Sequence, residues 1–244
     1  MRKLTLLLLL VVGLIVSPAI ASAANIFTMT PYQLGELYQV WETPSSAGTQ
    51  LNNIIPLPGI GAVYNGTILQ VPGTGTIDIG ANSTGTPFGG SGGSEPTNAA
   101  LGLGSLAGYD AYSLLFANTN ENPWHYGLWF QSGNYRVVGP WTEIDNGTMS
   151  SITLDFSYAH VYLVDTGVDQ GWKNLSSVGG DFNLANISAI GFTIGATVPM
   201  PGLIGGNTDY AFETTVAPVP EPASMTLLGL GVLGLLGLRR KKAV

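Results

Sequence analysis

The stretch SITLDFSYAHVYLV, residues 151–164, shows most clearly which kind of fold the chain adopts. Polar and apolar side chains alternate through residues 151–156, and a second run of strand-forming residues follows at 158–164. β-Branched and aromatic residues pack well on a pleated surface, and a period of two places one face of a strand against a core. This stretch therefore predicts two successive β-strands.

Runs of the same kind recur on both sides of this stretch, with Gly, Asn, Asp or Pro in nearly every gap. Many short strands with turn residues between them predict a mainly β fold, an antiparallel β-sandwich or jelly roll. A parallel β-solenoid is the alternative, but no fixed repeat period supports it. The further runs lie at residues 76–79, 111–117, 126–130, 135–138, 187–198 and 210–216, and residues 63–69 predict a hairpin closed by an Asn65-Gly66 turn.

One short helix is expected near the start of the domain, over residues 31–42. Thr30 and Gln33 form a capping-box pattern, with Pro31 at the first helical position. Apolar residues then follow at helical spacing, at Leu34, Leu37, Tyr38 and Trp41. Further along, residues 72–108 are rich in Gly, Ser and Thr, and we expect a long flexible loop there because such a composition buries little apolar surface.

The first 23 residues have the features of a secretory signal peptide. Arg2 and Lys3 precede an apolar run over residues 4–16, Pro18 interrupts it, and residues 21–23 read Ala-Ser-Ala, a site that signal peptidase accepts. We therefore expect an exported domain over residues 24–218, followed by a C-terminal segment over residues 219–244.

The charge of the exported domain restricts its partners. Residues 24–218 hold fourteen of the chain's fifteen acidic residues but two of its eight basic ones, Arg136 and Lys173, so the net charge is about −12. Nucleic acids and anionic membrane surfaces bind clustered Lys and Arg, which displace counterions. We therefore expect neither partner. The chain has no cysteine, so the core relies on no disulfide or thiolate metal site.

The C-terminal segment combines an extended motif, a short apolar run and a basic end. Residues 223–238 would span about 24 Å as a helix, against a hydrocarbon core of about 30 Å, and four glycines lower their helix propensity. A basic cluster follows at once and holds the C-terminus on the cytoplasmic side, with the acidic domain outside. These basic stop-transfer residues are Arg239, Arg240, Lys241 and Lys242.

This arrangement resembles the PEP-CTERM sorting signal of Gram-negative bacteria. The resemblance covers about 26 residues and depends on the order of a signal peptide, the motif, an apolar helix and a basic tail. It implies recognition by an exosortase, a membrane-embedded protease that cuts near the Pro-Glu-Pro motif after transient insertion in the inner membrane. Prolines keep the motif extended, as a protease requires. The motif residues are Val219, Pro220, Glu221, Pro222, Ala223 and Ser224.

Catalytic candidates are few. His125 and His160 are the two histidines, and alternation places His160 on one face with Tyr158 and Tyr162, which is typical of an ordinary strand histidine. A glycoside hydrolase needs a pair of carboxylates at a set separation, which sequence spacing does not provide. We therefore expect no enzyme activity and no cofactor. The carboxylates considered for such a pair are Glu121, Glu143, Asp145, Asp155 and Asp165.

Calcium is the one metal that the sequence suggests. Asp165 and Asp169 lie in one acidic turn, and Glu143 and Asp145 lie in another. These oxygen ligands suit a loop-bound calcium ion, but neither turn has the spacing of an EF-hand loop.

The densest group of aromatic residues lies at 124–141. Indole and phenol rings stack on the apolar faces of sugars, so this group suggests a glycan-binding surface; the alternative is that the rings fill the core. Alternation places Trp129 opposite Leu128 and Phe130, which predicts that Trp129 is exposed. The candidate glycan-binding residues are Trp124, Trp129, Trp141 and Tyr135.

Together these features predict an exported, exosortase-sorted protein of the cell surface. The resemblance implies association with exopolysaccharide or biofilm matrix, and the aromatic group adds carbohydrate binding as a hypothesis. A secreted polysaccharide hydrolase and a structural adhesin that binds no sugar are the alternatives.

Overall fold

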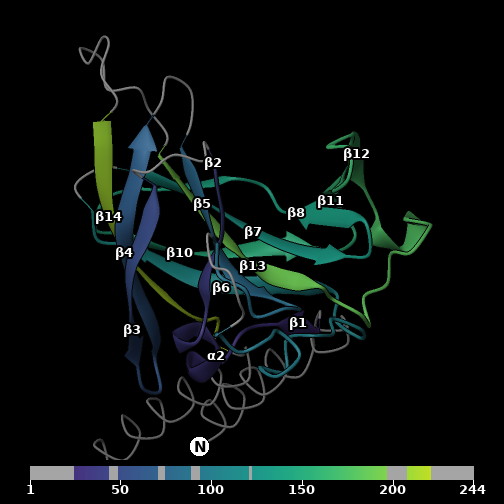
Figure 1. Ribbon diagram of the computed structural model, residues 1–244, viewed down its shortest axis with the longest axis horizontal. Coiled ribbons are helices and arrows are strands. Elements are labelled where there is room, and N and C mark those ends of the chain that lie inside the picture. Colours follow the sequence, from purple (N-terminus) through teal and green to yellow (C-terminus); the bar gives the residue numbers. More distant parts are fainter. Residues whose placement is uncertain are drawn as a thin grey trace, which may run out of the picture.

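The computed structural model describes residues 25–43, 49–70, 75–88, 94–120, 123–196 and 208–220. Two β-sheets lie face to face, and the short helix α2 closes one end (Figure 1). The pairings are antiparallel throughout this part of the chain, except that β1 runs parallel to β6. The predicted β-sandwich is confirmed. The predicted signal peptide lies outside the described residues, as do most of the sorting signal and Glu121.

The first sheet, called sheet A, has β6 and β14 at its centre. Its order is β1-β6-β14-β4-β3. Strand β10 also pairs with β6, off this path. Its strands are β1 Ile26–Phe27, β3 Gln50–Leu57, β4 Gly61–Gln70, β6 Ala111–Asn118, β10 Met149–Asp155 and β14 Thr208–Pro218.

The second sheet, called sheet B, has β7 and β13 at its centre. Its order is β12-β11-β8-β7-β13-β5-β2, and β9 also pairs with β7. Its strands are β2 Tyr38–Thr43, β5 Thr76–Asn82, β7 Trp124–Ser132, β8 Tyr135–Val138, β9 Thr142–Ile144, β11 Ala159–Leu163, β12 Asp169–Lys173 and β13 Ala189–Ala196. The helical elements are α2 Pro31–Gly35 and a 3-10 turn, η1 Leu175–Ser177.

Large apolar side chains fill the space between the sheets. Tyr64 and Phe116 from sheet A both pack edge-on against Phe192 from sheet B, with ring centroids 5.0 and 5.4 Å apart. Contacts of this kind add to the gain from burial itself. Because the inner faces are taken up by this core, a ligand site on the sandwich has to lie on an outer face or at an edge.

The helix is shorter than the sequence predicted. The capping box at Thr30 and Gln33 is present, but α2 ends at Gly35 and residues 38–43 form β2. The carbonyl of Leu34 accepts a hydrogen bond from the Tyr64 hydroxyl, and the next turn of a helix would need that carbonyl for the Tyr38 amide. The apolar spacing fitted a helix by coincidence, and tertiary contacts favour the strand.

The predicted hairpin at residues 63–69 is wrong. Asn65 and Gly66 lie inside the continuous strand β4, where Gly66 pairs with Leu51 on one side and Phe212 on the other. A Cβ atom at Gly66 would come within 2.7 Å of the Phe212 ring. The glycine is therefore needed for close packing of a core phenylalanine, and it makes no turn.

The segment 72–108 is not one long loop. Strand β5 lies within it and pairs with both β13 and β2. Further on, Leu101, Leu103 and Leu106 are buried, and Asn98 donates to the carbonyl of Ile187 at 2.5 Å. Few apolar residues are enough here because most of the larger ones, such as the three leucines, enter the core.

The two ends of the folded domain lie beside each other. Strand β14 pairs with β6 as far as Pro218, and the amide of Val219 donates to the Thr28 hydroxyl at 3.1 Å. The start of the sorting motif is thus joined to the sheet without a spacer. Within the described ranges, no helix is long and apolar enough to cross a membrane.

Candidate functional site

A hollow of about 180 Å3 lies on the outer face of sheet B. Its floor is one row of register partners across four strands: Trp41 on β2 pairs with Asp78 on β5, Asp78 with Thr193 on β13, and Thr193 with Gly127 on β7. Paired residues share a face, and three strand spacings give the row a width of about 14 Å. We call this site the outer hollow, and define it by Trp41, Thr76, Asp78, Gly127, Arg136, Trp141 and Thr193.

A β-bulge in β2 brings Trp41 to this face. Gln39 pairs with Ile79 and Trp41 with the next residue, Asp78, so Val40 is extra. Without the bulge, Trp41 would lie on the same side of the strand as Gln39. Bulges are frequent at sheet edges and beside functional sites because they redirect a side chain in this way. Trp41 remains 52% exposed.

Trp141 forms the opposite wall of the outer hollow. A Cβ atom at Gly195 would lie 3.1 Å from the Trp141 ring, and one at Gly127 would lie 3.9 Å from it. The indole thus rests on the backbone of β7 and β13, at two positions where the absence of side chains makes room. Trp141 is nevertheless 51% exposed, so the rest of its surface is open to a ligand.

A partly buried ion pair forms the polar part of the floor. One carboxylate oxygen of Asp78 lies 2.6 Å from a guanidinium nitrogen of Arg136, and the other accepts a hydrogen bond from the Thr193 hydroxyl. The guanidinium lies 4.6 Å from the centre of the Trp129 ring. Arg136 is thus held by a carboxylate and an aromatic face, which fixes its remaining N–H donors for a ligand.

The predicted aromatic group is divided between the core and the surface. Alternation placed Trp129 on the correct face, but Arg136 covers it and it is only 1% exposed, so the prediction of exposure is wrong. Trp124 is 3% exposed and contacts Phe212 in the core. Tyr135 lies on the other side of β8 from Arg136 and packs edge-on against Phe182. Of the four predicted glycan-binding residues, Trp141 is the one at the outer hollow.

His125 lies beside the outer hollow, next to Trp141. Its ring centre is 6.5 Å from that of Trp141, and its Nε2 atom is 3.6 Å from a carboxylate oxygen of Glu143. Burial lowers the pKa of His125 below its usual 6.5, and the Glu143 carboxylate partly offsets this effect. The folded state therefore favours the neutral imidazole, and the buried Nδ1 atom has no hydrogen-bond partner in the described structure.

The lowered pKa of His125 predicts a loss of stability in mild acid. Because the unfolded chain binds the proton more readily, the contribution of this residue is present above about pH 6.5 and is lost as the pH falls through the folded-state pKa. The free energy of unfolding should therefore fall more steeply for the wild type than for His125→Gln between pH 7 and 5. Denaturant titrations at several pH values measure this difference. Parallel profiles would contradict the prediction.

His160 and the carboxylates considered for calcium lie outside the lining of the outer hollow. His160 lies between Tyr162, whose hydroxyl is 2.8 Å from Nδ1, and Asp169, whose carboxylate is 2.8 Å from Nε2. Asp169 also accepts from the amide of Gly171. Of the calcium candidates, Asp165 and Asp169 lie in or beside the turn before β12, and Glu143 and Asp145 lie in β9 and directly after it. The described ranges contain no group of three His, Cys, Asp or Glu residues that could hold an ion.

The described carboxylates considered for hydrolysis lie on separate elements, except that Asp145 directly follows the strand of Glu143. Glu143 is on β9, Asp155 ends β10, and Asp145 and Asp165 lie in turns. The described lining of the outer hollow contains one carboxylate, Asp78, and both of its oxygens are engaged. The sequence interpretation missed Asp78 and Trp41 as site residues. The β-branched and aromatic residues within 38–43 were the available signal for a strand, but the helical spacing concealed it.

Comparisons with known proteins identify the C-terminal segment. Residues 218–241 match the family model of the PEP-CTERM protein-sorting motif. No curated protein matches the chain. Among solved structures, the fold is similar to the family 11 carbohydrate-binding module of the cellulosomal cellulase Lic26A-Cel5E of Clostridium thermocellum, with a TM-score of 0.38 and 12% identity over 82% of this chain and 90% of that one. The chain is an exported protein that carries a PEP-CTERM motif, the signal by which an exosortase sorts its substrates.

Proposed function

We propose that this protein is released by exosortase cleavage to the cell surface, where the outer hollow binds a neutral glycan of the extracellular matrix. The observation that carries the proposal is the pair of half-exposed tryptophans on the two sides of a polar floor. Signal peptidase would remove residues 1–23, and the tail would be inserted in the inner membrane only until cleavage. We place the protein in a Gram-negative exopolysaccharide or biofilm matrix.

The chemistry of the outer hollow suits a sugar ring. Each face of a pyranose carries C–H groups that pack on an indole, and its edge carries hydroxyls that need donors and acceptors. Trp41 and Trp141 provide the rings, and Thr76, Thr193 and Arg136 line the space between them. Two half-exposed tryptophans that line one hollow form a contiguous aromatic surface, and such surfaces mark ligand-binding grooves.

The charge of the domain selects a neutral glycan. Among the described residues that line the outer hollow, Arg136 is the one cation, and Asp78 neutralises it. The rest of the domain is strongly acidic, so a chain of uronic acids would meet repulsion with no unpaired cation in that lining to offset it. Neutral hexoses meet no such barrier.

Calorimetric titration of the processed protein with neutral and acidic polysaccharides tests the proposed function. Neutral glycans should bind with measurable heat, and polyuronates should not. A protein that binds no glycan but self-associates would instead be a structural adhesin, and one that shortens the glycan during the titration would be a hydrolase. Either result would contradict the proposal.

Exosortase sorting predicts a defined mature mass. Protein isolated from its native host should lack both residues 1–23 and the segment that contains Leu238 and Arg240. The glycine-containing apolar run is too short for a lasting membrane anchor, so it should act as a sorting signal that is removed. Intact-mass spectrometry measures both ends at once, and a strain without exosortase is the control. A mature protein that retains Arg240 in the wild-type strain would refute the prediction.

A further inference from the structure

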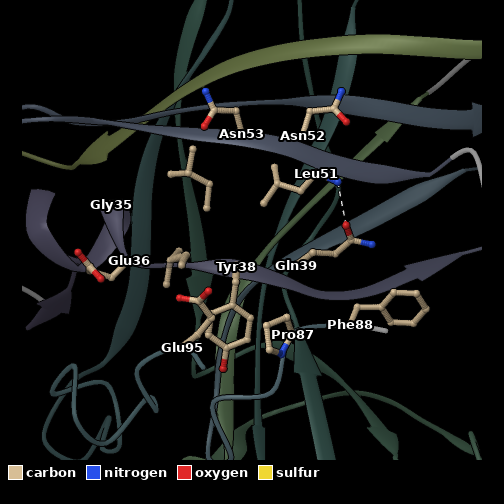
Figure 2. Close-up of a pocket in the computed structure, with 12 residues that line it drawn as sticks. Gly35, Glu36, Tyr38, Gln39, Leu51, Asn52, Asn53, Pro87, Phe88 and Glu95 are labelled. Atoms are coloured by element: carbon tan, nitrogen blue, oxygen red, sulfur yellow. Dashed lines mark hydrogen bonds between the residues drawn. The ribbon is translucent and has the colours of Figure 1, made fainter. Parts of the chain in front are cut away.

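A second cavity of about 460 Å3 lies between the edge strands of the two sheets. It is bounded by β2 of sheet B, β3 of sheet A and the segment that contains Pro87 and Phe88 (Figure 2). We call it the edge cleft. Its walls include Glu36, Gln39, Leu51, Ile54, Phe88 and Glu95.

Two facing β-bulges shape the edge cleft. Val40 is the extra residue in β2, and Asn52 is the extra residue in β3, where Leu51 pairs with Gly66 and Asn53 with Asn65. The side-chain oxygen of Gln39 accepts from the amide of Leu51 at 2.8 Å, which joins the two edges at this level. A bulge on each edge strand protects that strand from pairing with another chain. This protection does not explain why an open cavity lies between the two strands.

The edge cleft and the outer hollow share one wall. Trp41 lines the outer hollow, Phe88 lines the edge cleft, and their rings meet edge-on with centroids 5.9 Å apart. The amide of Phe88 also donates to the carbonyl of Gln39, so this aromatic pair is fixed on strand β2. A ligand that leaves the outer hollow over Trp41 therefore reaches Phe88 and then the cleft.

The lining of the edge cleft suits further sugar units of the same kind. Figure 2 shows Phe88 at one end and Glu36 at the other, with Tyr38 and Glu95 between them, while the amides of Asn52 and Asn53 point away from Tyr38 and Gln39. Carboxylates accept strong hydrogen bonds from hydroxyls, and Leu51 and Ile54 offer apolar surface. The same carboxylates repel an anionic chain.

From this continuity we infer that the ligand is an internal stretch of a neutral polysaccharide chain, which occupies the outer hollow and continues over Trp41 and Phe88 into the edge cleft. This inference rests on the proposed function of the outer hollow. It adds that a single sugar or a short end of a chain fills only part of the site. Glu36, Glu95 and Phe88 would contact the sugar units that a short ligand lacks.

The dependence of affinity on chain length tests this inference. The probes are neutral gluco-oligosaccharides of one to six units in the β1,3, β1,4 and α1,4 series, with size fractions of the host exopolysaccharide. Affinity for the series that binds should rise at least about tenfold from two to six units, which is a modest gain for added contacts. Equal affinity for the short and the long members would overturn the inference and leave the proposed function intact.

Variants of the edge cleft separate it from the outer hollow. Phe88→Ala and the double variant Glu36→Gln/Glu95→Gln should reduce the affinity for six units to that for two. The double variant should also leave two-unit binding unchanged, whereas Phe88 contacts Trp41 of the outer hollow. Met149→Ala removes an exposed apolar side chain from β10 of sheet A and should change neither affinity. An equal loss at both lengths in the double variant would overturn the inference, and absence of binding of the wild type at every length would overturn the proposed function as well.

Discussion

Replacing either Trp41 or Trp141 by alanine should weaken glycan binding at least about 30-fold, because truncation of a central aromatic side chain at a binding site typically costs about 2 kcal/mol or more. Both indoles are half-exposed and the fold does not depend on burying them, so the variants should remain folded. The double variant should bind no detectable glycan. Calorimetric titration with a neutral oligosaccharide of six units measures both losses.

Trp172→Ala provides the matched control. Trp172 is 42% exposed, also lies on sheet B, and stacks on Tyr158 and His160 outside the outer hollow. The variant should bind as the wild type does. Full affinity in Trp141→Ala, or a loss in Trp172→Ala equal to that in Trp141→Ala, would show that the ligand binds elsewhere on the domain.

Arg136→Ala should lower the free energy of unfolding by about 3 kcal/mol. Removal of one partner from a buried ion pair leaves an uncompensated charge, here on Asp78, whose side chain is only 5% exposed. The value lies at the lower end of the usual range because the Arg136 side chain is itself 25% exposed. Loss of the cover over Trp129 adds to the effect. The melting temperature should fall by roughly 6–12 °C for a domain of this size.

The double variant Asp78→Asn/Arg136→Gln separates the charge from the packing. It replaces the ion pair by two neutral amides, so no uncompensated charge is left and the variant should be more stable than Arg136→Ala in urea denaturation. An effect of Arg136→Ala below 1 kcal/mol would mean that water compensates Asp78, as at an exposed salt bridge. The floor of the outer hollow would then not be a rigid platform for a ligand.

The sequence predicted the β-sandwich because most strands have strong local patterns. The alternating residues 151–156 largely coincide with the end of β10, and the run at 135–138 coincides with β8. Strands with weaker patterns, such as β3 and β12, were missed. β3 reads Gln-Leu-Asn-Asn-Ile-Ile-Pro-Leu, and its bulge at Asn52 breaks the alternation that would have identified it.

The candidate site was harder to predict because register decides its composition. Trp41 and Asp78 are 37 positions apart, and they meet because the bulge at Val40 shifts β2 by one residue against β5. No local pattern reports such a shift. The exposure of the tryptophan side chains was equally hard to predict from the sequence. Arg136 covers Trp129, whereas the ring of Trp141 rests on two glycines and stays half-exposed.

The sorting signal, in contrast to the outer hollow, could be predicted from the sequence. Its motif, apolar segment and basic tail are contiguous and are read by other proteins as a linear sequence, so residue order alone was enough to identify it. The match to the PEP-CTERM motif over residues 218–241 confirms that prediction. The fold adds that the motif starts directly at the end of β14, where Val219 contacts Thr28.

Affinity electrophoresis of the processed protein through gels that contain the host's neutral exopolysaccharide is the most direct test of glycan binding at the outer hollow. The wild-type protein should be retarded relative to a gel without polysaccharide, and the Trp41→Ala/Trp141→Ala variant should migrate equally in both gels. If the double variant is retarded as strongly as the wild type, or if the wild type is not retarded at all, the outer hollow is not the glycan site.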